Sequence, residues 1–240
     1  EAIATEFPDV SFTSETTPGS YAARNKGISL AKGEYLAFTD SDCIVDEDWL
    51  KRGAASLEKN PECGLVGGEV KVTFANPEKP TAVELYEQLF AFPQRTYIEK
   101  DHFSVTANLF TSRAVFDAVG LFNDSLESGG DREWGNRVSD AGYPLIYDES
   151  VCIRHPARRT FNELRRKATR VMGGVYEIDS AGVEDTSKAK ILRLLGFLVP
   201  PFKSIIRTFR DKRLGTLGRK LKVAVVLIAV RYVNAFQYAR

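Results

Sequence analysis

The stretch Tyr35-Leu36-Ala37-Phe38-Thr39-Asp40-Ser41-Asp42 joins a compact apolar run to a pair of aspartates. The apolar run is typical of a strand that is buried in a sheet. Ligands of open α/β sheets collect at the carboxyl ends of the strands, where Asp40 and Asp42 are expected to lie. Two carboxylates at such an edge can share one hard divalent cation, Mg²⁺ or Mn²⁺, which then bridges a diphosphate. The alternative is an acidic turn that caps the helix beginning at Trp49.

Elements on both sides of this strand alternate between helix and strand. A short strand is expected at residues 10–12 and a helix at 21–32, followed downstream by a helix at 49–59 and a strand at 65–72. This alternation predicts an α/β fold with a mostly parallel, Rossmann-like sheet flanked by helices.

The remaining elements continue this pattern. Helices are predicted at residues 82–92 and 131–141, and strands at 105–110, 144–147 and 151–154. From residue 161 onwards the pattern is helical and basic. No internal repeat interrupts it.

Charge divides the 240 residues into two parts. Residues 1–153 carry 13 Lys/Arg and 26 Asp/Glu, a net charge of −13, whereas residues 154–240 carry 20 and 6, a net charge of +14. We expect a catalytic domain at residues 1–160 and a basic amphipathic helical region at 161–240. An acidic body suits a bound cation and repels a nucleic-acid backbone, so a nucleic-acid partner is not expected. Three scattered cysteines indicate a reducing compartment rather than a disulfide framework.

A glycine turn at residues 128–130 leads into the helix that begins near Asp131. A carboxylate on such a turn can point into a cleft and deprotonate an alcohol, so Asp131 is a candidate general base. Glu133, two positions later, is a candidate for orienting Asp131 or a substrate hydroxyl. The alternative is that Asp131 only caps its helix.

His155 follows the predicted strand at 151–154 and precedes a run of cations at Arg158, Arg159, Arg165, Arg166, Lys167 and Arg170. Imidazole at a strand end can complete a carboxylate metal site, although a lone histidine is more often structural. The cations form a solvated face, a nucleic-acid patch or a site for a diphosphate ligand. No base-reading motif accompanies them.

Several of these stretches, in order and spacing, resemble the family 2 glycosyltransferases with the GT-A fold. The resemblance spans about residues 7–174 and rests on the segments 23–27, 31–42, 108–110, 116–123 and 129–133. It implies a membrane-associated member of bacterial type. It also implies that the family's first strand, with an acidic residue for the nucleotide base, would precede Glu1, so we expect an N-terminally truncated chain.

The resemblance also implies roles for individual residues. Asp40 and Asp42 match the Asp-x-Asp motif that holds the metal and the sugar-nucleotide diphosphate. Asp131 matches the carboxylate base of inverting members, and His155 matches a histidine near the metal. Arg24 together with Asn25 matches the helix start that lines the nucleotide pocket.

Arg170 resembles the arginine of a late motif in the same family. In that motif an aromatic residue follows the arginine, whereas Val171 follows Arg170 here. We therefore include Arg170 among the donor-binding candidates on a partial match.

The basic tail suggests attachment to a membrane surface. Its longest uninterrupted apolar run, 223–230, is too short to cross a bilayer, which needs about 20 residues. We expect interfacial helices whose cations contact anionic headgroups, placing the protein in the cytoplasm on the inner face of the membrane. The alternative is that these helices pack on the catalytic body.

Together these features predict an inverting, metal-dependent glycosyltransferase. Its donor would be a nucleotide-diphosphate sugar, its cofactor Mg²⁺ or Mn²⁺, and its acceptor a glycan or lipid-linked hydroxyl, as in cell-wall or polysaccharide synthesis. A nucleotidyltransferase on a related sheet and a non-catalytic membrane- or glycan-binding module remain the rival hypotheses.

Overall fold

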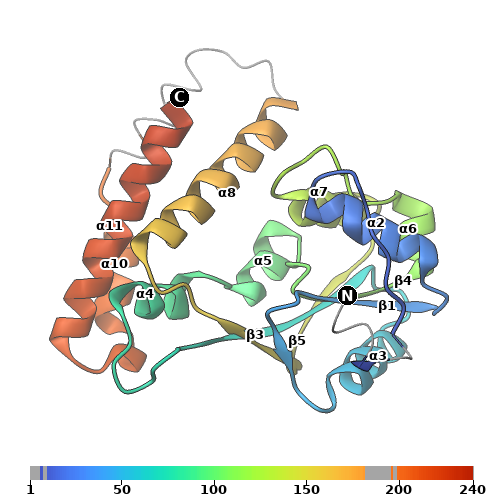
Figure 1. Ribbon diagram of the computed structural model, residues 1–240, viewed down its shortest axis with the longest axis horizontal. Helices are drawn as coiled ribbons and strands as arrows, with labels where there is room; N and C mark the ends of the chain where they lie inside the picture. Colours follow the sequence, from blue (N-terminus) through green and yellow to red (C-terminus); the bar gives the residue numbers. More distant parts are fainter. Residues whose placement is uncertain (1–5, 8–9, 182–195, 197–198, 240) are drawn as a thin grey trace.

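A computed structural model describes residues 6–7, 10–181, 196 and 199–239. Its centre is a curled five-stranded sheet in the order β1-β4-β3-β5-β2, flanked by helices (Figure 1). The strands are β1 (Tyr35–Thr39), β2 (Ile44–Val45), β3 (Leu65–Thr73), β4 (Asn108–Ser112) and β5 (Leu145–Pro156). The helices are α2 (Ser20–Leu30), α3 (Trp49–Lys59), α4 (Ala82–Phe90), α5 (Gln94–Asp101), α6 (Arg113–Val119), α7 (Gly130–Asp140), α8 (Phe161–Ala181), α10 (Phe202–Arg210) and α11 (Leu217–Ala239), with a 3-10 turn η1 (Lys212–Leu214).

Strand direction confirms the α/β class but corrects the prediction of a mostly parallel sheet. β1, β3 and β5 run the same way, yet β4 lies between β1 and β3 in the opposite direction. β2 is also antiparallel to its neighbour β5, so the β3–β5 pair is the one parallel pairing among the described strands. An apolar run reports burial rather than direction, so the alternation of elements could not reveal the reversal of β4.

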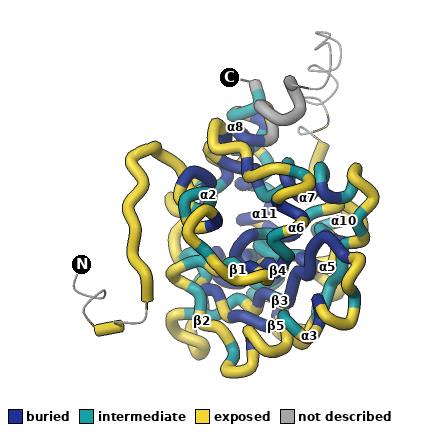
Figure 2. Tube along the Cα trace, turned by 90° about the vertical axis from the view of Figure 1, so that its right-hand side faces the viewer, coloured by how far each residue is buried: buried dark blue, intermediate teal, exposed yellow. Residues whose placement is uncertain are grey.

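The N-terminal part of the fold also differs from expectation. β1 has its predicted bounds, but it lies at an edge of the described sheet, where Leu36 is its one buried residue. Residues 10–12 form no strand; they are exposed and precede α2 outside the compact body (Figure 2). A short apolar segment becomes a strand only when a neighbouring strand accepts its hydrogen bonds.

Two hydrophobic clusters cover the two faces of the sheet. Successive residues of a strand point to opposite faces, so Leu109 packs with α2, α6 and α7 while Phe110 packs with α3. Leu65 and Val66 divide between the faces in the same way. On the α3 side the rings of Trp49 and Phe110 meet edge to face at 4.7 Å.

The buried amide of Asn108 joins the bulge of β5 to β3 and α3. The β3–β5 pairing jumps from Gly68 opposite Asp148 to Glu69 opposite Cys152, so the two strands predicted at 144–147 and 151–154 form one bulged strand. Asn108 accepts a hydrogen bond from the Trp49 indole and donates to the carbonyls of Glu69 and Val151, each at 2.9 Å.

The helices of the C-terminal region form a layer beside the body. α8 and α11 lie side by side in Figure 1, and both pack on α4 through the buried residues Val83, Leu164, Ala168, Val226 and Val230. α10 packs against α11. One face of this region therefore rests on the body, as the packing alternative proposed.

Removal of the Asn108 amide tests how far the bulge depends on it. Asn108→Ala leaves the Trp49 N–H and two backbone carbonyls buried without partners, and each such loss costs about 1–3 kcal/mol. We expect the free energy of unfolding in urea to fall by about 3 kcal/mol or more. Asn162→Ala, on an exposed helix start, should change it by less than about 0.5 kcal/mol. Equal effects of the two variants would contradict this role.

Candidate active site

A cavity of about 670 Å³ opens at the carboxyl ends of β1 and β5. β1 and β5 share a direction, so Asp40, just after β1, and His155, near the end of β5, reach the same edge. Helices α2, α5, α7 and α8 supply the other walls. The charged residues of its lining are Arg24, Asp40, Asp101, Asp131, Arg132, Arg158, Lys167 and Arg170. Cations outnumber carboxylates in this set, which favours an anionic ligand.

Asp40 pairs with Arg24 across this cavity. The guanidinium of Arg24, from α2, lies 2.7 Å from Asp40 Oδ1, and both side chains are partly exposed to the cavity. The structure thus brings these two predicted donor-binding residues together. The Asp40 carboxylate therefore pairs with a guanidinium and is not grouped with the Asp42 carboxylate.

Asp42 lies instead beside His155. Asp42 Oδ1 is 3.8 Å from His155 Nε2, and the sulfur of Cys43 lies 4.0 Å from the same carboxylate oxygen. The ligand atoms of Asp42, Cys43 and His155 all lie within 4.8 Å of one another. Carboxylate and imidazole donors at this spacing fit a divalent cation, with Asp42 and His155 as its holders.

Asp131 lies on the opposite wall of the cavity, in the first turn of α7. The N-cap of α7 is Gly129, so Asp131 is not the capping residue. It accepts hydrogen bonds from the Tyr21 hydroxyl at 3.3 Å and from the Arg132 backbone N–H at 3.0 Å. A Cβ on Gly130 would lie 2.7 Å from the Tyr21 ring, so a glycine there lets α2 approach.

The environment of Asp131 suits proton transfer. Burial raises the pKa of the Asp131 carboxyl above its ordinary value, against the lowering effects of its hydrogen bonds and of Arg24. Burial, with the Asp131 charge as the next cause, raises the pKa of Tyr21 to about 12, so Tyr21 stays a hydrogen-bond donor. A carboxylate with a raised pKa is a stronger base than an ordinary aspartate.

Three predicted site residues, Asn25, Asp42 and Glu133, are not part of the cavity lining. Asp42 lies beside His155, whereas the other two are held by contacts elsewhere. Glu133 lies two positions after Asp131 on α7, and residues two apart on a helix face different ways. Its carboxylate therefore points away from Asp131 and accepts hydrogen bonds of 2.7 and 3.0 Å from Arg137. The Asn25 amide is fully engaged with the backbone of Phe122, donating at 2.9 Å and accepting at 3.1 Å. Both residues support neighbouring loops in this geometry.

Sequence reasoning missed a buried carboxylate behind the basic cluster. Glu87 of α4 is 1% exposed and accepts hydrogen bonds from Arg158 at 3.0 Å and Lys167 at 3.3 Å. Burial lowers the pKa of Lys167, while Glu87 opposes that shift. Two cations for one buried carboxylate leave positive charge facing the cavity. The sequence feature that could have revealed this buried carboxylate is a glutamate within the apolar helix predicted at 82–92.

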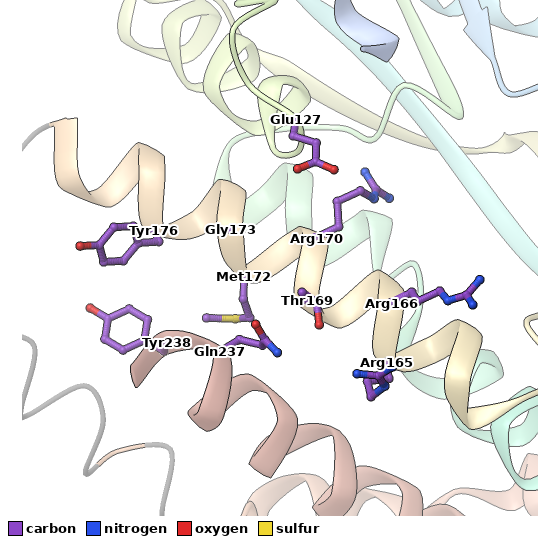
Figure 3. Close-up of a pocket in the computed structure, with 10 residues that line it drawn as sticks. All are labelled: Glu127, Arg165, Arg166, Thr169, Arg170, Met172, Gly173, Tyr176, Gln237 and Tyr238. Carbon is purple, nitrogen blue, oxygen red and sulfur yellow. The ribbon is translucent and has the colours of Figure 1, made fainter. Parts of the chain in front are cut away.

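A second hollow, which we call the α8–α11 groove, adjoins the cavity and has a volume of about 710 Å³. Figure 3 shows arginines at one end and tyrosines at the other. Arg170 lines both spaces and donates to Ser128 Oγ at 3.3 Å. The groove is lined by Glu127, Arg165, Arg166, Thr169, Arg170, Met172, Gly173, Tyr176, Gln237 and Tyr238.

Comparison with known proteins identifies the class that this fold and cavity define. The sequence model of Glycosyl transferase family 2 matches residues 1–120. Glycosyltransferase AglE of Haloferax volcanii is 36% identical over 215 residues, which cover 88% of this chain and 69% of AglE. The chain therefore belongs to family 2 of the glycosyltransferases.

Two further matches are more distant. A glucosyl-dolichyl phosphate glucuronosyltransferase of Haloferax volcanii is 23% identical over 158 residues, covering 65% of this chain and 47% of that protein. The solved mannosyltransferase PcManGT of Pyrobaculum calidifontis, in complex with GDP-Man and Mn²⁺, has a TM-score of 0.53 and 20% identity. That match covers 94% of this chain and 59% of PcManGT, and it confirms the GT-A fold. Neither rival function, nucleotidyltransferase or non-catalytic module, is favoured by these matches.

Proposed function

We propose that this glycosyltransferase moves a sugar from a nucleotide-diphosphate donor to an acceptor hydroxyl with inversion at the anomeric carbon. The observation that carries the proposal is the position of Asp131. Its carboxylate has a raised pKa and lies in one cavity with Asp40, His155 and an excess of cations. The Mn²⁺ and GDP-Man named for PcManGT agree with such a donor site.

The donor diphosphate would lie on the cationic wall. Arg24, Arg158, Lys167 and Arg170 reach the cavity from α2, the segment after β5, and α8. Mg²⁺ or Mn²⁺ held by Asp42 and His155, with Asp40 nearby in the chain, would neutralise the diphosphate as it leaves. Arginine suits this wall because its planar guanidinium binds phosphate oxygens in pairs.

Asp131 takes the proton of the acceptor hydroxyl. The Tyr21 hydroxyl, 3.3 Å away, keeps the carboxylate oriented in the cavity. Deprotonation lets the acceptor oxygen attack the anomeric carbon from the side opposite the diphosphate, which inverts the configuration. Glu133 plays no part in this step, because Arg137 holds it outside the cavity.

The two acids of α7 provide a matched test of this mechanism. Asp131→Asn should lower turnover by at least roughly 10²-fold, the lower end for loss of a general base, with donor affinity within a few-fold. Glu133→Gln should keep most of the turnover. In the unmodified chain kcat/KM should fall as the pH drops through the raised pKa of Asp131, since only the carboxylate accepts a proton. A product with retained configuration would reject the inverting mechanism.

Asp42 is the residue on which metal-dependent donor binding should depend. Asp42→Asn removes the charge beside His155, so Mn²⁺-dependent donor binding measured by calorimetry should be lost while the fold is kept. Asp48→Asn, an exposed acid that pairs with Arg52, is the control and should bind donor normally. Unchanged donor affinity of Asp42→Asn with Mn²⁺ would contradict this metal site.

We propose further that the acceptor is linked to a lipid phosphate and lies in the α8–α11 groove. Arg165, Arg166 and Arg170 suit a phosphate, while Met172 and the tyrosine end suit an apolar chain. Arg170 connects this groove to the cavity that holds Asp131. The dolichyl phosphate in the name of one relative agrees with such an acceptor.

Arg166 allows a test of the acceptor side alone, because it lines the groove but not the cavity. Arg166→Gln should raise KM for an isoprenyl-phosphate-linked acceptor by about tenfold, near the lower end of the roughly 1.5–3 kcal/mol expected for a charged hydrogen bond. Donor affinity should not change. Arg159→Gln, a cation outside the groove, is the control. Equal acceptor KM for both variants would remove the groove from acceptor binding.

The C-terminal helices have a second face that supports a membrane partner. α10 exposes Phe202 (62%) and Ile206 (51%) between cations, and α11 exposes Leu217, Leu221, Val225, Tyr232 and Phe236. We propose that this face lies on the inner surface of the cytoplasmic membrane, with residues 161–240 as the attachment region. The domain boundary expected after residue 160 runs through the cavity, because Lys167 and Arg170 of α8 line it together with residues before 160.

Among the described residues, α11 is the one helix long and apolar enough to cross a membrane. The most apolar 18-residue window within Leu217–Tyr238 has a mean hydropathy of 1.3, and 33% of that window is buried. This segment was not identified from the sequence as a possible span, because only uninterrupted apolar residues were counted and Arg231 and Asn234 interrupt the apolar stretch.

Vesicle flotation separates charge from hydrophobic anchoring. We expect binding to anionic vesicles, since each cation near such a leaflet contributes on the order of 1 kcal/mol, and partial release at high salt. Ile206→Asp should weaken the salt-resistant part, whereas Leu50→Asp, on the exposed side of α3, should not. Equal partition onto neutral and anionic vesicles would remove the charge argument. Absence of binding would favour helices that only pack on the body.

A further inference from the structure

Cys43 contributes a third donor atom beside Asp42 and His155. Its sulfur lies 4.0 Å from Asp42 Oδ1, and the ligand atoms of the three residues are mutually within 4.8 Å. Metal–ligand bonds of about 2.0–2.3 Å place the ligands of one ion roughly 3–4 Å apart. Small rotations of the Asp42 and Cys43 side chains would therefore bring all three donors to one ion.

The register of the sheet fixes Cys43 opposite His155. β2 pairs antiparallel with β5, with Ile44 opposite Arg154 and Val45 opposite Ile153. Continuing that register by one residue places Cys43 opposite His155. The backbone N–H of Cys43 donates to the carbonyl of Asp40 at 3.0 Å, which holds the thiol in the turn that follows β1.

His155 is oriented as a ligand independently of Cys43. Its Nδ1 lies 2.8 Å from the carbonyl of Pro156, which only accepts, so Nδ1 carries a proton and Nε2 is the nitrogen that can bind a metal ion. The ring packs on Phe92 at 4.7 Å, and the side chain is 8% exposed. Nε2 faces Asp42 without a hydrogen bond to any described residue. Carbonyl bonds of this kind orient histidine ligands in metal sites.

We propose that Cys43 is a protein ligand at this cation site and that its thiol makes the site bind thiophilic ions such as Zn²⁺ and Cd²⁺ in competition with Mg²⁺ or Mn²⁺. The inference rests on the metal site of the proposed function and adds a sulfur donor to its oxygen and nitrogen donors. Binding of a thiophilic ion transfers the thiol proton to solvent and forms a metal–thiolate bond. Mg²⁺ and Mn²⁺ prefer oxygen, so they gain little from the sulfur.

Cobalt titration of the full chain detects a sulfur ligand directly. Co²⁺ should produce the near-ultraviolet charge-transfer absorption of a cobalt–thiolate bond, and Zn²⁺ should remove it. Cys63→Ala, which deletes a buried thiol in the core cluster that contains Trp49 and Phe110, should keep the absorption, whereas Cys43→Ser should lose it. Zn²⁺ affinity of Cys43→Ser should fall on the order of 10–100-fold, with Mn²⁺ affinity within about threefold.

Alkylation provides a second measurement on the unmodified chain. Cd²⁺ should slow the iodoacetamide labelling of Cys43, identified by peptide mass, and Mg²⁺ at the same occupancy should protect it less. A cobalt–thiolate band that survives in Cys43→Ser, or labelling that Cd²⁺ leaves unchanged, would overturn the proposal. If the unmodified chain shows Mn²⁺-dependent donor binding but no band, the sulfur ligand fails while the proposed donor site stands. If Asp42→Asn also leaves donor binding unchanged, the donor site fails as well.

Discussion

The hydrogen bonds of the Asn108 amide are the constraint on which the site depends. They join α3, β3 and the bulge of β5 at one buried point. A Cβ on Gly68 would lie 1.9 Å from the carbonyl of Val151, so only a glycine lets β5 bulge so close to β3. Beyond the bulge β5 resumes its pairing with β3 and reaches His155 at the cavity edge. The packing of the core thus decides where the imidazole lies.

The local sequence pattern was enough to predict the bounds of elements that bury one continuous apolar face. β1 and α3 have their predicted bounds, because each is a short apolar or amphipathic run between clear turn residues. The helix predicted at 82–92 ends at Phe90, and a separate helix, α5, begins at Gln94. The direction of β4 and the bulge in β5 depend on contacts between distant segments, which no local pattern contains.

The candidate site shows the same division. Asp40, Asp131 and His155, which were expected at strand ends and a helix start, line one cavity, and so does Arg170, which was included on a partial match to a family motif. Glu133 and Asn25 could not be assigned from sequence, because their partners, Arg137 and Phe122, become visible only when helix faces and loops are placed. The sulfur of Cys43 meets His155 through the β2–β5 register, across more than a hundred residues of chain.

The Arg24–Asp40 ion pair has a thermodynamic consequence for ligand binding. An anion that draws Arg24 away would leave the Asp40 charge uncompensated and available to a cation, and a cation that draws Asp40 away would leave Arg24 available to an anion. Each ligand thereby removes part of the cost of binding the other. Reciprocity requires that both affinities change by the same factor. Under the proposed function, this one contact between two side chains would couple the diphosphate and the metal, so that the two would bind with positive cooperativity.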